Sequence, residues 1–183
     1  FTFLPKKYKN EFITYVYKAL NDFSDMFLKD NKLDFEKFKE FFELPTEDFQ
    51  DQSRIENIHN KLLKLNDEYL KDLEKEKLRN ETSNIRCVSL LIETRPDCGM
   101  LQEGNEILSY GGTKVELGIQ SVYDEDLEFV NRGHTVQDSI NSIRIMKDLG
   151  FKLNLHYMLG LCEDRKKDLE GLKSLFSNPD FRP

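Results

Sequence analysis

Hydrophobic residues recur with two different periods along this chain of 183 residues, and the change of period divides it in two. From Pro5 to about residue 70, apolar residues are spaced three or four apart, as in amphipathic helices. From Arg86 onwards, short alternating runs are separated by helical runs. Strands and helices in alternation predict parallel strands joined by right-handed crossovers. All nine glycines lie at or after Gly99, which supports the same division.

The first part predicts helices, including an insert from residue 24 to residue 70. Pro5 suits a first helical turn, and three apolar stripes follow it. The insert is expected to pack on the apolar faces of its own helices; the alternative is that a stripe docks a partner protein. The stripes consist of Phe12, Tyr15, Val16, Ala19 and Leu20, of Phe35, Phe38, Phe41 and Phe42, and of Ile55, Ile58, Leu62, Leu65 and Tyr69.

The second part predicts three strands over Arg86–Glu93, Lys114–Gln120 and Lys152–Met158. Side chains alternate across a strand, and each of these strands has one aliphatic and one largely polar face. The aliphatic faces comprise Val88, Leu90 and Ile92, then Val115, Leu117 and Ile119, then Leu153, Leu155 and Tyr157.

The polar faces carry Glu93, Gln120 and His156 at or near the carboxyl ends of the strands, where α/β folds build their sites. A parallel sheet covered by helices on both sides would be apolar on both faces. Leaving such groups buried without partners costs roughly 2–7 kcal/mol each. The pattern therefore favours a curved, open parallel sheet whose polar face binds a polar ligand. The alternative is that each group only hydrogen-bonds the end of its own strand.

Two helices of the second part have clear boundaries. Thr135 is a good N-cap with Asp138 three residues later, and that helix is expected to end at Gly150. A final helix is marked by Leu169, Leu172 and Phe176 and is expected to end at Asn178-Pro179.

Composition narrows the class of protein. The net charge of −7 does not by itself indicate nucleic-acid binding, and no apolar run approaches the roughly 20 residues of a membrane span. Cys87, Cys98 and Cys162 lack the spacing of a metal knuckle, and their odd number argues against a disulfide framework. They are typical of reduced thiols in a cytoplasmic protein. The absence of an initial Met suggests a piece of a longer protein.

Three motifs together resemble a known family. GIQS at residues 118–121, followed by NRGHT at 131–135, resembles the fourth strand and following helix of radical S-adenosylmethionine enzymes. With IETRPD at residues 92–97, the set is more specifically similar to the catalytic subunits of Elongator complexes. The resemblance covers Phe1–Asp22 and about Leu73–Pro183. The residues between look like an insert after the second barrel strand.

The resemblance implies an α/β fold, the central part of an open (β/α) barrel, over residues 1–183, with strands three to five in residues 71–183. It implies S-adenosylmethionine, a 4Fe-4S cluster whose cysteine ligands precede Phe1, and acetyl-CoA bound mainly by an acetyltransferase domain after Pro183. The implied reaction adds a carboxymethyl-type group from acetyl-CoA to carbon 5 of the wobble uridine of tRNA. The implied partners are tRNA and other Elongator-type subunits, without a membrane. This piece alone is expected to be inactive.

The resemblance also implies roles for individual residues. Arg132 suits the cofactor carboxylate, and Glu93 a cation or a hydroxyl group. Gln120 can bridge donor and acceptor groups, and His156 stands near the ribose. The full expected set comprises Glu93, Gln120, Arg132, His156 and Met158 for cofactor binding, and Arg95 and His134 at the rim for substrate or phosphate.

Alternatives remain for function and for the rim. One is a non-catalytic scaffold that retained the cofactor pocket, and another is a different radical enzyme similar to coproporphyrinogen oxidase. At the rim, Arg95 and His134 can equally fix loops through a salt bridge or a hydrogen bond.

Overall fold

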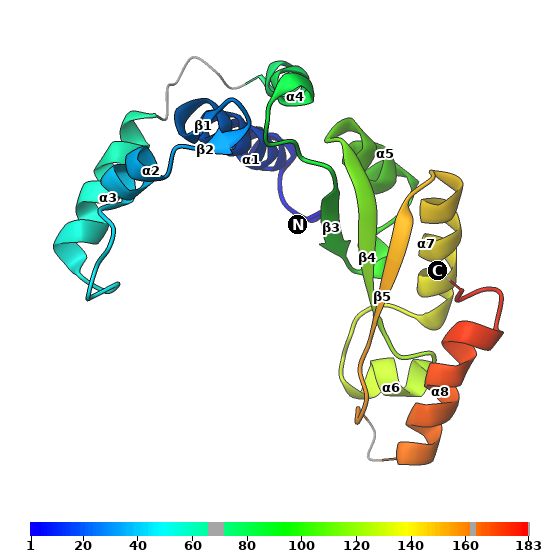
Figure 1. Ribbon diagram of the computed structural model, residues 1–183. Helices are drawn as coiled ribbons and strands as arrows, with labels where there is room; N and C mark the ends of the chain where they lie inside the picture. Colours follow the sequence, from blue (N-terminus) through cyan, green and yellow to red (C-terminus); the bar gives the residue numbers. More distant parts are fainter. Residues whose placement is uncertain (66–71, 162–163, 183) are drawn as a thin grey trace. The chain divides into compact units, whose positions relative to one another are not determined.

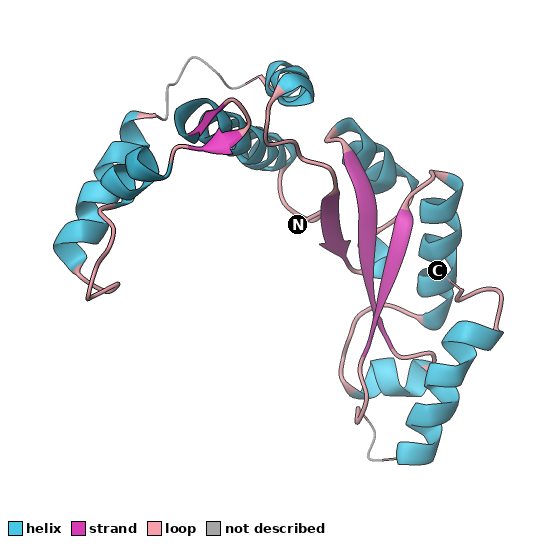
Figure 2. Cartoon of the chain, in the orientation of Figure 1, coloured by secondary structure: helices cyan, strands magenta, loops and turns pink. Residues whose placement is uncertain are grey.

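The computed structural model describes residues 1–65, 72–161 and 164–182, and the chain divides into two compact units. We call Phe1–Lys9 with Val88–Pro183 the sheet unit, and Asn10–Cys87 the helical unit. Figure 1 shows the elements along the chain, and Figure 2 shows that the parallel strands belong to the sheet unit. Tyr69 and Cys162, named in the sequence analysis, lie outside the described residues.

The sheet unit alternates strands with helices. Its strands pair in the order β3-β4-β5, and both pairs are parallel. The predicted α/β class with a parallel sheet is therefore confirmed, and within the described ranges the sheet does not close into a barrel. The elements are β3 (Leu90–Thr94), η1 (Pro96–Cys98), α5 (Leu101–Ser109), β4 (Gly112–Gln120), α6 (Asp124–Phe129), α7 (Val136–Asp148), β5 (Lys152–Tyr157) and α8 (Arg165–Ser177).

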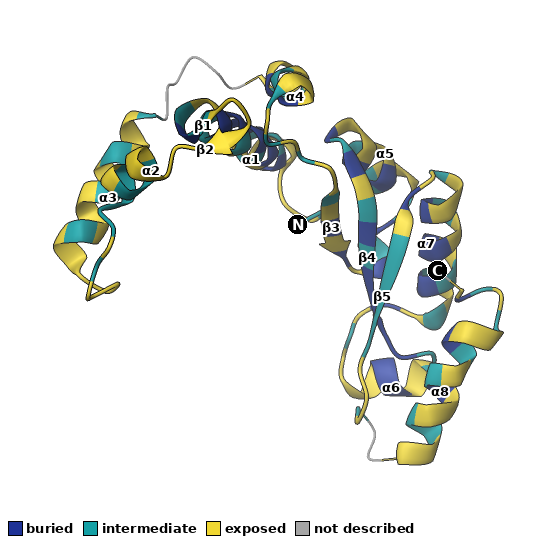
Figure 3. Cartoon of the chain, viewed as in Figure 1, coloured by how far each residue is buried: buried dark blue, intermediate teal, exposed yellow. Residues whose placement is uncertain are grey.

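The core of the sheet unit lies between one face of the sheet and the helices α5 and α7 (Figure 3). Val115, Leu117 and Ile119 of β4 are fully buried, as the alternating pattern predicted. Ile107 of α5 and Ile143 of α7 are almost fully buried as well. Burying an aliphatic side chain of this size contributes about 1.5–3 kcal/mol, so this face fixes the central strand firmly.

The first strand begins later than predicted, at Leu90 rather than Arg86. The backbone N–H of Cys87 donates to Asn80 Oδ1 (2.7 Å) in the helical unit, and Val88 is 90% exposed. Residues 86–89 therefore link the two units. The predicted start was wrong because alternation along a strand cannot reveal that the Cys87 amide bonds to the Asn80 side chain.

Helix α7 begins as predicted, because the Thr135 hydroxyl accepts from the Asp138 amide and the Asp138 carboxylate accepts from the Thr135 amide. Helix α8 ends at Ser177 with Asn178 as its C-cap, which confirms the predicted end. Phe176 is 70% exposed, whereas Gly171 and Leu175 are buried. Gly171 leaves the space that Tyr157 of β5 fills, and this close approach decides which face of α8 is buried.

The helical unit contains α1 (Lys6–Phe27), which begins in the sheet unit, and a short antiparallel hairpin of β1 (Leu28–Lys29) and β2 (Lys32–Leu33). Three helices follow: α2 (Phe35–Phe42), α3 (Gln52–Lys64) and α4 (Leu73–Thr82). The rings of Phe38, Phe41 and Phe42 all lie 5.5–5.9 Å from the ring of Phe27. Three of the predicted phenylalanines therefore pack on α1.

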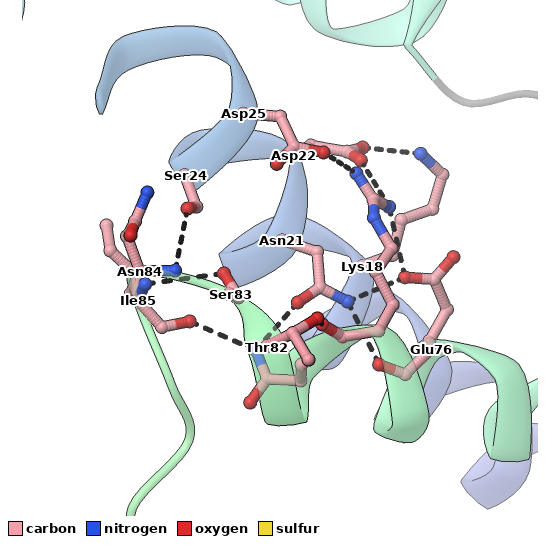
Figure 4. Close-up of polar contacts among 12 residues, drawn as sticks. Lys18, Asn21, Asp22, Ser24, Asp25, Glu76, Thr82, Ser83, Asn84 and Ile85 are labelled. Carbon is pink, nitrogen blue, oxygen red and sulfur yellow. Dashed lines mark hydrogen bonds and ion pairs between the residues drawn. The ribbon is translucent and has the colours of Figure 1, made fainter. Parts of the chain in front are cut away.

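Helix α1 packs against α4 through polar groups that the sequence did not predict (Figure 4). Asn21 is fully buried; its amide donates to Glu76 Oε2 (2.8 Å), and its carbonyl accepts from Asn80 (2.7 Å). Ser24 accepts from the Asn84 amide. By contrast Phe12, a member of the predicted stripe, is 49% exposed. The buried face of α1 is thus partly polar.

Candidate functional site

Four polar side chains from all three strands meet on the face of the sheet opposite the core. His156 Nδ1 lies 3.2 Å from Glu93 Oε1, and His156 Nε2 lies 3.2 Å from Glu116 Oε2. Asn154 Nδ2 donates to Glu116 Oε1 at 2.8 Å. We call Glu93, Glu116, Asn154 and His156 the strand cluster. Its ligand-type atoms from the two glutamates and the histidine all lie within 4.8 Å of one another.

The strand register brings the cluster together. Glu93 of β3 pairs with Glu116 of β4, and Glu116 pairs with Asn154 of β5. His156 follows Asn154 by two positions, so its side chain lies on the same face. The predicted grouping of Glu93 and His156 on one polar face is confirmed by this geometry.

The electrostatics of the cluster depend on the histidine ring. Carboxylates directly opposite each other on neighbouring strands repel, as do Glu93 and Glu116. His156 lies between them, and both its nitrogens donate hydrogen bonds only when both carry hydrogen. A cation placed there, whether an imidazolium or a group on a ligand, offsets the repulsion of the two carboxylates.

Gln120 and Arg132 meet over Gly118, two positions after Glu116 on β4. A Cβ atom at position 118 would lie 2.9 Å from Gln120 Nε2 and 3.0 Å from Arg132 Nη2. The absence of a side chain at Gly118 therefore makes the space in which the amide and the guanidinium lie. Gln120 has a positive φ of 65°, and the pairing of β4 with β5 shifts register between Leu117 and Gln120.

Two buried nitrogens near this point lack hydrogen-bond partners within the described residues: Arg132 Nε and His134 Nδ1. His134 is only 6% exposed, and its Nε2 lies 3.3 Å from the carbonyl oxygen of Ile119. Burial lowers the pKa of His134, and the neighbouring Arg132 lowers it further. The ring is therefore neutral near pH 7. A neutral ring that donates through Nε2 presents Nδ1 as an unused acceptor.

The remaining predicted residues lie around these groups. Arg95 is exposed and forms a bidentate ion pair with Asp97, which lowers the pKa of that carboxyl. The guanidinium of Arg95 also lies over Gly133, 3.6 Å from the position of a Cβ there. Met158 is 50% exposed, and its backbone N–H donates to the Gln120 carbonyl at 2.9 Å. Within the described part of the chain, the Met158 side chain has no hydrogen bond or ion pair with the strand cluster.

Sequence reasoning missed Glu116, Asn154 and Gly118 as members of the site. Glu116 and Asn154 stand on the polar faces that the alternation predicted, but they lie in mid-strand, whereas the search favoured strand ends. The register supplies the missing signal, because it places Glu116 beside Glu93 and Asn154 beside Glu116. Gly118 has no functional side chain, so the sequence gives no sign of its role. The structure shows that the ends of Gln120 and Arg132 lie where a side chain at this position would stand.

Comparison with known proteins identifies the class. The profile of the Radical SAM superfamily matches residues 48–176, so the chain belongs to that superfamily. This confirms the resemblance that the motifs GIQS, NRGHT and IETRPD indicated. IETRPD and GIQS stand at the carboxyl ends of β3 and β4, and NRGHT lies on the connection between α6 and α7.

Individual relatives make the resemblance more specific. The chain is 49% identical over 113 residues to a tRNA uridine(34) acetyltransferase of Methanocaldococcus jannaschii, an alignment that covers 61% of this chain and 21% of that protein. It is 36% identical over 143 residues to Elongator complex protein 3 of Saccharomyces cerevisiae, covering 78% and 25%. A solved structure of Elp3 from Methanocaldococcus infernus matches with a TM-score of 0.60 and 45% identity, covering 62% and 27%. The chain thus spans about a fifth to a quarter of these curated relatives.

The residues present fit S-adenosylmethionine, the cofactor that gives the superfamily its name. The cofactor carries a carboxylate, for which Arg132 offers an unused buried N–H, and an ammonium, for which the strand cluster offers carboxylates. Gly118 leaves space between these groups. An iron–sulfur cluster has no such match in the described ranges. Cys87 and Cys98 are free thiols outside any potential ligand group, and Cys162 is not among the residues described.

Proposed function

We propose that this chain is the central part of a radical S-adenosylmethionine enzyme that modifies carbon 5 of the wobble uridine of tRNA. The added carboxymethyl-type group comes from acetyl-CoA. The proposal rests on the relatives named for acetyl transfer to uridine 34 and on the polar face of the sheet. The observation that supports it best is that two buried nitrogens lack partners within the described residues, Arg132 Nε and His134 Nδ1, because buried polar groups in native proteins are nearly always hydrogen-bonded.

When bound, S-adenosylmethionine together with a 4Fe-4S cluster would supply the radical chemistry that removes a hydrogen atom from the methyl group of acetyl-CoA. The chain itself binds and orients. Arg132 holds the carboxylate of the cofactor through a charge-assisted hydrogen bond, and Glu93 accepts from its ammonium or a hydroxyl group. Gln120 fixes the same end through its amide, and His156 lies where the ribose is expected. Met158 offers an apolar contact for the adenine.

The substrate side of the proposal concerns the rim of the site. Arg95 and His134 stand on the loops that follow β3 and α6, beyond the carboxyl ends of the strands. An exposed guanidinium suits a phosphate of tRNA, provided that it leaves Asp97 on binding. Further Elongator-type subunits complete the proposed assembly. We place this reaction in the cytoplasm; no helix among the described residues is long and apolar enough to cross a membrane.

One experiment separates the proposal from its rivals. The full-length protein is reconstituted anaerobically with iron and sulfide, and 5′-deoxyadenosine formation from S-adenosylmethionine is measured with and without acetyl-CoA and tRNA. The proposed enzyme forms deoxyadenosine in a manner that depends on acetyl-CoA and modifies the tRNA. Cofactor binding without cleavage favours the non-catalytic scaffold. Cleavage that ignores acetyl-CoA and tRNA favours a different radical enzyme and overturns the assignment.

A further inference from the structure

We propose that Glu116 is a positioning residue that fixes the ring of His156 in the cofactor pocket, while Glu93 is the carboxylate that turns to the ligand. This inference rests on the proposed function. It assigns different tasks to two glutamates that lie side by side on neighbouring strands and contact the same ring.

Glu116 is anchored at both of its oxygens. Oε1 accepts from Asn154 Nδ2 at 2.8 Å, and Oε2 lies 3.2 Å from His156 Nε2. The side chain is 20% exposed and projects from β4, the central strand, whose neighbouring residues Val115 and Leu117 are fully buried. A carboxylate held by two partners on a rigid strand has little freedom to move. It therefore fixes the plane of the imidazole ring that it contacts.

Glu93 differs in every one of these respects. Its side chain is 60% exposed, it stands one residue before the end of β3, and its one ion pair among the described residues is with His156 Nδ1 at 3.2 Å. An ion pair this exposed contributes little, because solvent screens it and both side chains lose freedom. Glu93 can therefore leave His156 at small cost and turn to a cationic group of the ligand. His156 then keeps its orientation through Glu116.

The same atoms have the composition of a divalent cation site, since two carboxylates and an imidazole lie within 4.8 Å. The placement of the carboxylates argues against that occupant. Glu93 lies at one nitrogen of the ring and Glu116 at the other, each at 3.2 Å, whereas a metal ion is bound through one ring nitrogen and leaves the other to a second partner. The contacts thus favour positioning over metal binding.

The test is a cycle of variants in the full-length protein, with S-adenosylmethionine affinity measured by titration calorimetry. Glu116→Gln is expected to weaken binding about fivefold, the effect of losing one hydrogen bond, with little change in the melting temperature. His156→Leu removes the group through which Glu116 acts. The double variant is therefore expected to bind no more weakly than His156→Leu alone. Glu128→Gln, an exposed glutamate of the same unit, serves as the control.

Additive losses in the double variant would show that Glu116 acts on the ligand directly. An unchanged affinity in Glu116→Gln would show that Glu116 has no role in binding. Either result overturns the inference. A second readout needs no cofactor. In the ligand-free protein, the Nε2–H resonance of His156 in nitrogen-15 NMR is expected to persist in Glu93→Gln and to be lost by solvent exchange in Glu116→Gln. Survival of the resonance in Glu116→Gln contradicts the proposal.

These readouts also distinguish a failure of the proposed function from a failure of the positioning role of Glu116. If the wild-type protein fails to bind S-adenosylmethionine, the proposed function fails, while the NMR comparison still decides whether Glu116 holds the ring. A zinc titration completes the test. Stoichiometric zinc bound by the wild type and lost in both Glu93→Gln and His156→Leu would make the cluster a cation site and overturn the positioning role.

Discussion

The two units bury polar groups in different ways. In the helical unit, Asn21, Glu76 and Asn80 are almost fully buried, and each has hydrogen-bond partners between α1 and α4 (Figure 4). In the sheet unit, Arg132 and His134 each bury a nitrogen that has no partner within the described residues. The contrast distinguishes two uses of burial. A satisfied network stabilises the fold, whereas a buried group without a protein partner is open to water, an ion or a ligand, and we propose that here the cofactor completes the bonding.

The largest effect is expected from Asn21→Leu in the satisfied network. Leucine is similar in size but leaves the Glu76 carboxylate and the Asn80 amide short of partners. We expect a loss of about 3 kcal/mol in the free energy of unfolding, because several buried groups lose partners at once. Urea unfolding followed by circular dichroism measures it. Asn60→Leu, on the exposed side of α3, is the control and should change little. A loss below about 1 kcal/mol would show that the network is not a stabilising one.

The second prediction concerns Arg132, whose buried Nε has no hydrogen-bond partner within the described residues, and is tested by Arg132→Met. Methionine keeps most of the aliphatic stem and removes the guanidinium. S-adenosylmethionine affinity should fall by about 2 kcal/mol, or roughly 30-fold, because a charge-assisted hydrogen bond is lost. Stability should hold or rise, since a buried nitrogen without a partner disappears.

The matched control for Arg132 is Arg144→Met, which removes an exposed arginine that pairs with Asp180. It should leave cofactor affinity unchanged. A drop in melting temperature for Arg132→Met with unaltered affinity would show that Arg132 stabilises the fold, as the hydrogen-bonded groups of the helical unit do. The two units would then not differ in their use of buried polar groups.

The third prediction sharpens the contrast by filling the space beside Arg132. In Gly118→Ala, the new Cβ meets Gln120 Nε2 at 2.9 Å and Arg132 Nη2 at 3.0 Å. Both are ends of flexible side chains, so we expect stability to change by less than about 1.5 kcal/mol. Cofactor affinity should fall about fivefold, because both groups are displaced. The double variant of Gly118→Ala and Arg132→Met should lose less affinity than the sum of the losses in the two single variants. Full additivity would mean that Gly118 acts elsewhere.

The smallest effect is expected from the pH dependence of His134. Burial lowers its pKa below the ordinary value of about 6.5, so the unfolded chain binds the proton more readily than the folded one. Stability should therefore fall as the pH drops from about 6.5 through the lowered pKa. His134→Gln keeps a donor for the Ile119 carbonyl without titrating, and should flatten that part of the curve. Urea midpoints measured between about pH 7.5 and 5 test this. Replacing the exposed His59 should leave the slope intact.

The features that the sequence predicted correctly depend on short-range rules. Alternation in β4 placed Val115, Leu117 and Ile119 in the core, and the pair Thr135 and Asp138 located the start of α7. Glu93 and His156 were grouped because each belongs to the polar face of its own strand. None of these inferences needs knowledge of which distant residues meet.

The errors and omissions share the opposite property. Asn80 determines where β3 begins by accepting from the Cys87 amide, and Asn21 gives α1 a polar buried face; both depend on partners elsewhere in the chain. Glu116 became a candidate only when the register placed it beside His156. The roles of the named site residues, the limits of the insert at residues 24–70 and its position after a second barrel strand remain predictions.

The left-handed backbone at Gln120 has a consequence for which sequences this site permits. A φ of 65° is readily adopted by glycine, asparagine and aspartate, and it disfavours valine, isoleucine and threonine strongly. Position 118 is restricted by space instead, since any side chain meets the amide of Gln120 or the guanidinium of Arg132. Backbone conformation thus limits the residues allowed at position 120, and available space limits those allowed at position 118. A saturation library selected for folding should accept asparagine at 120 and alanine at 118, whereas a selection for cofactor binding should retain little besides glycine at 118.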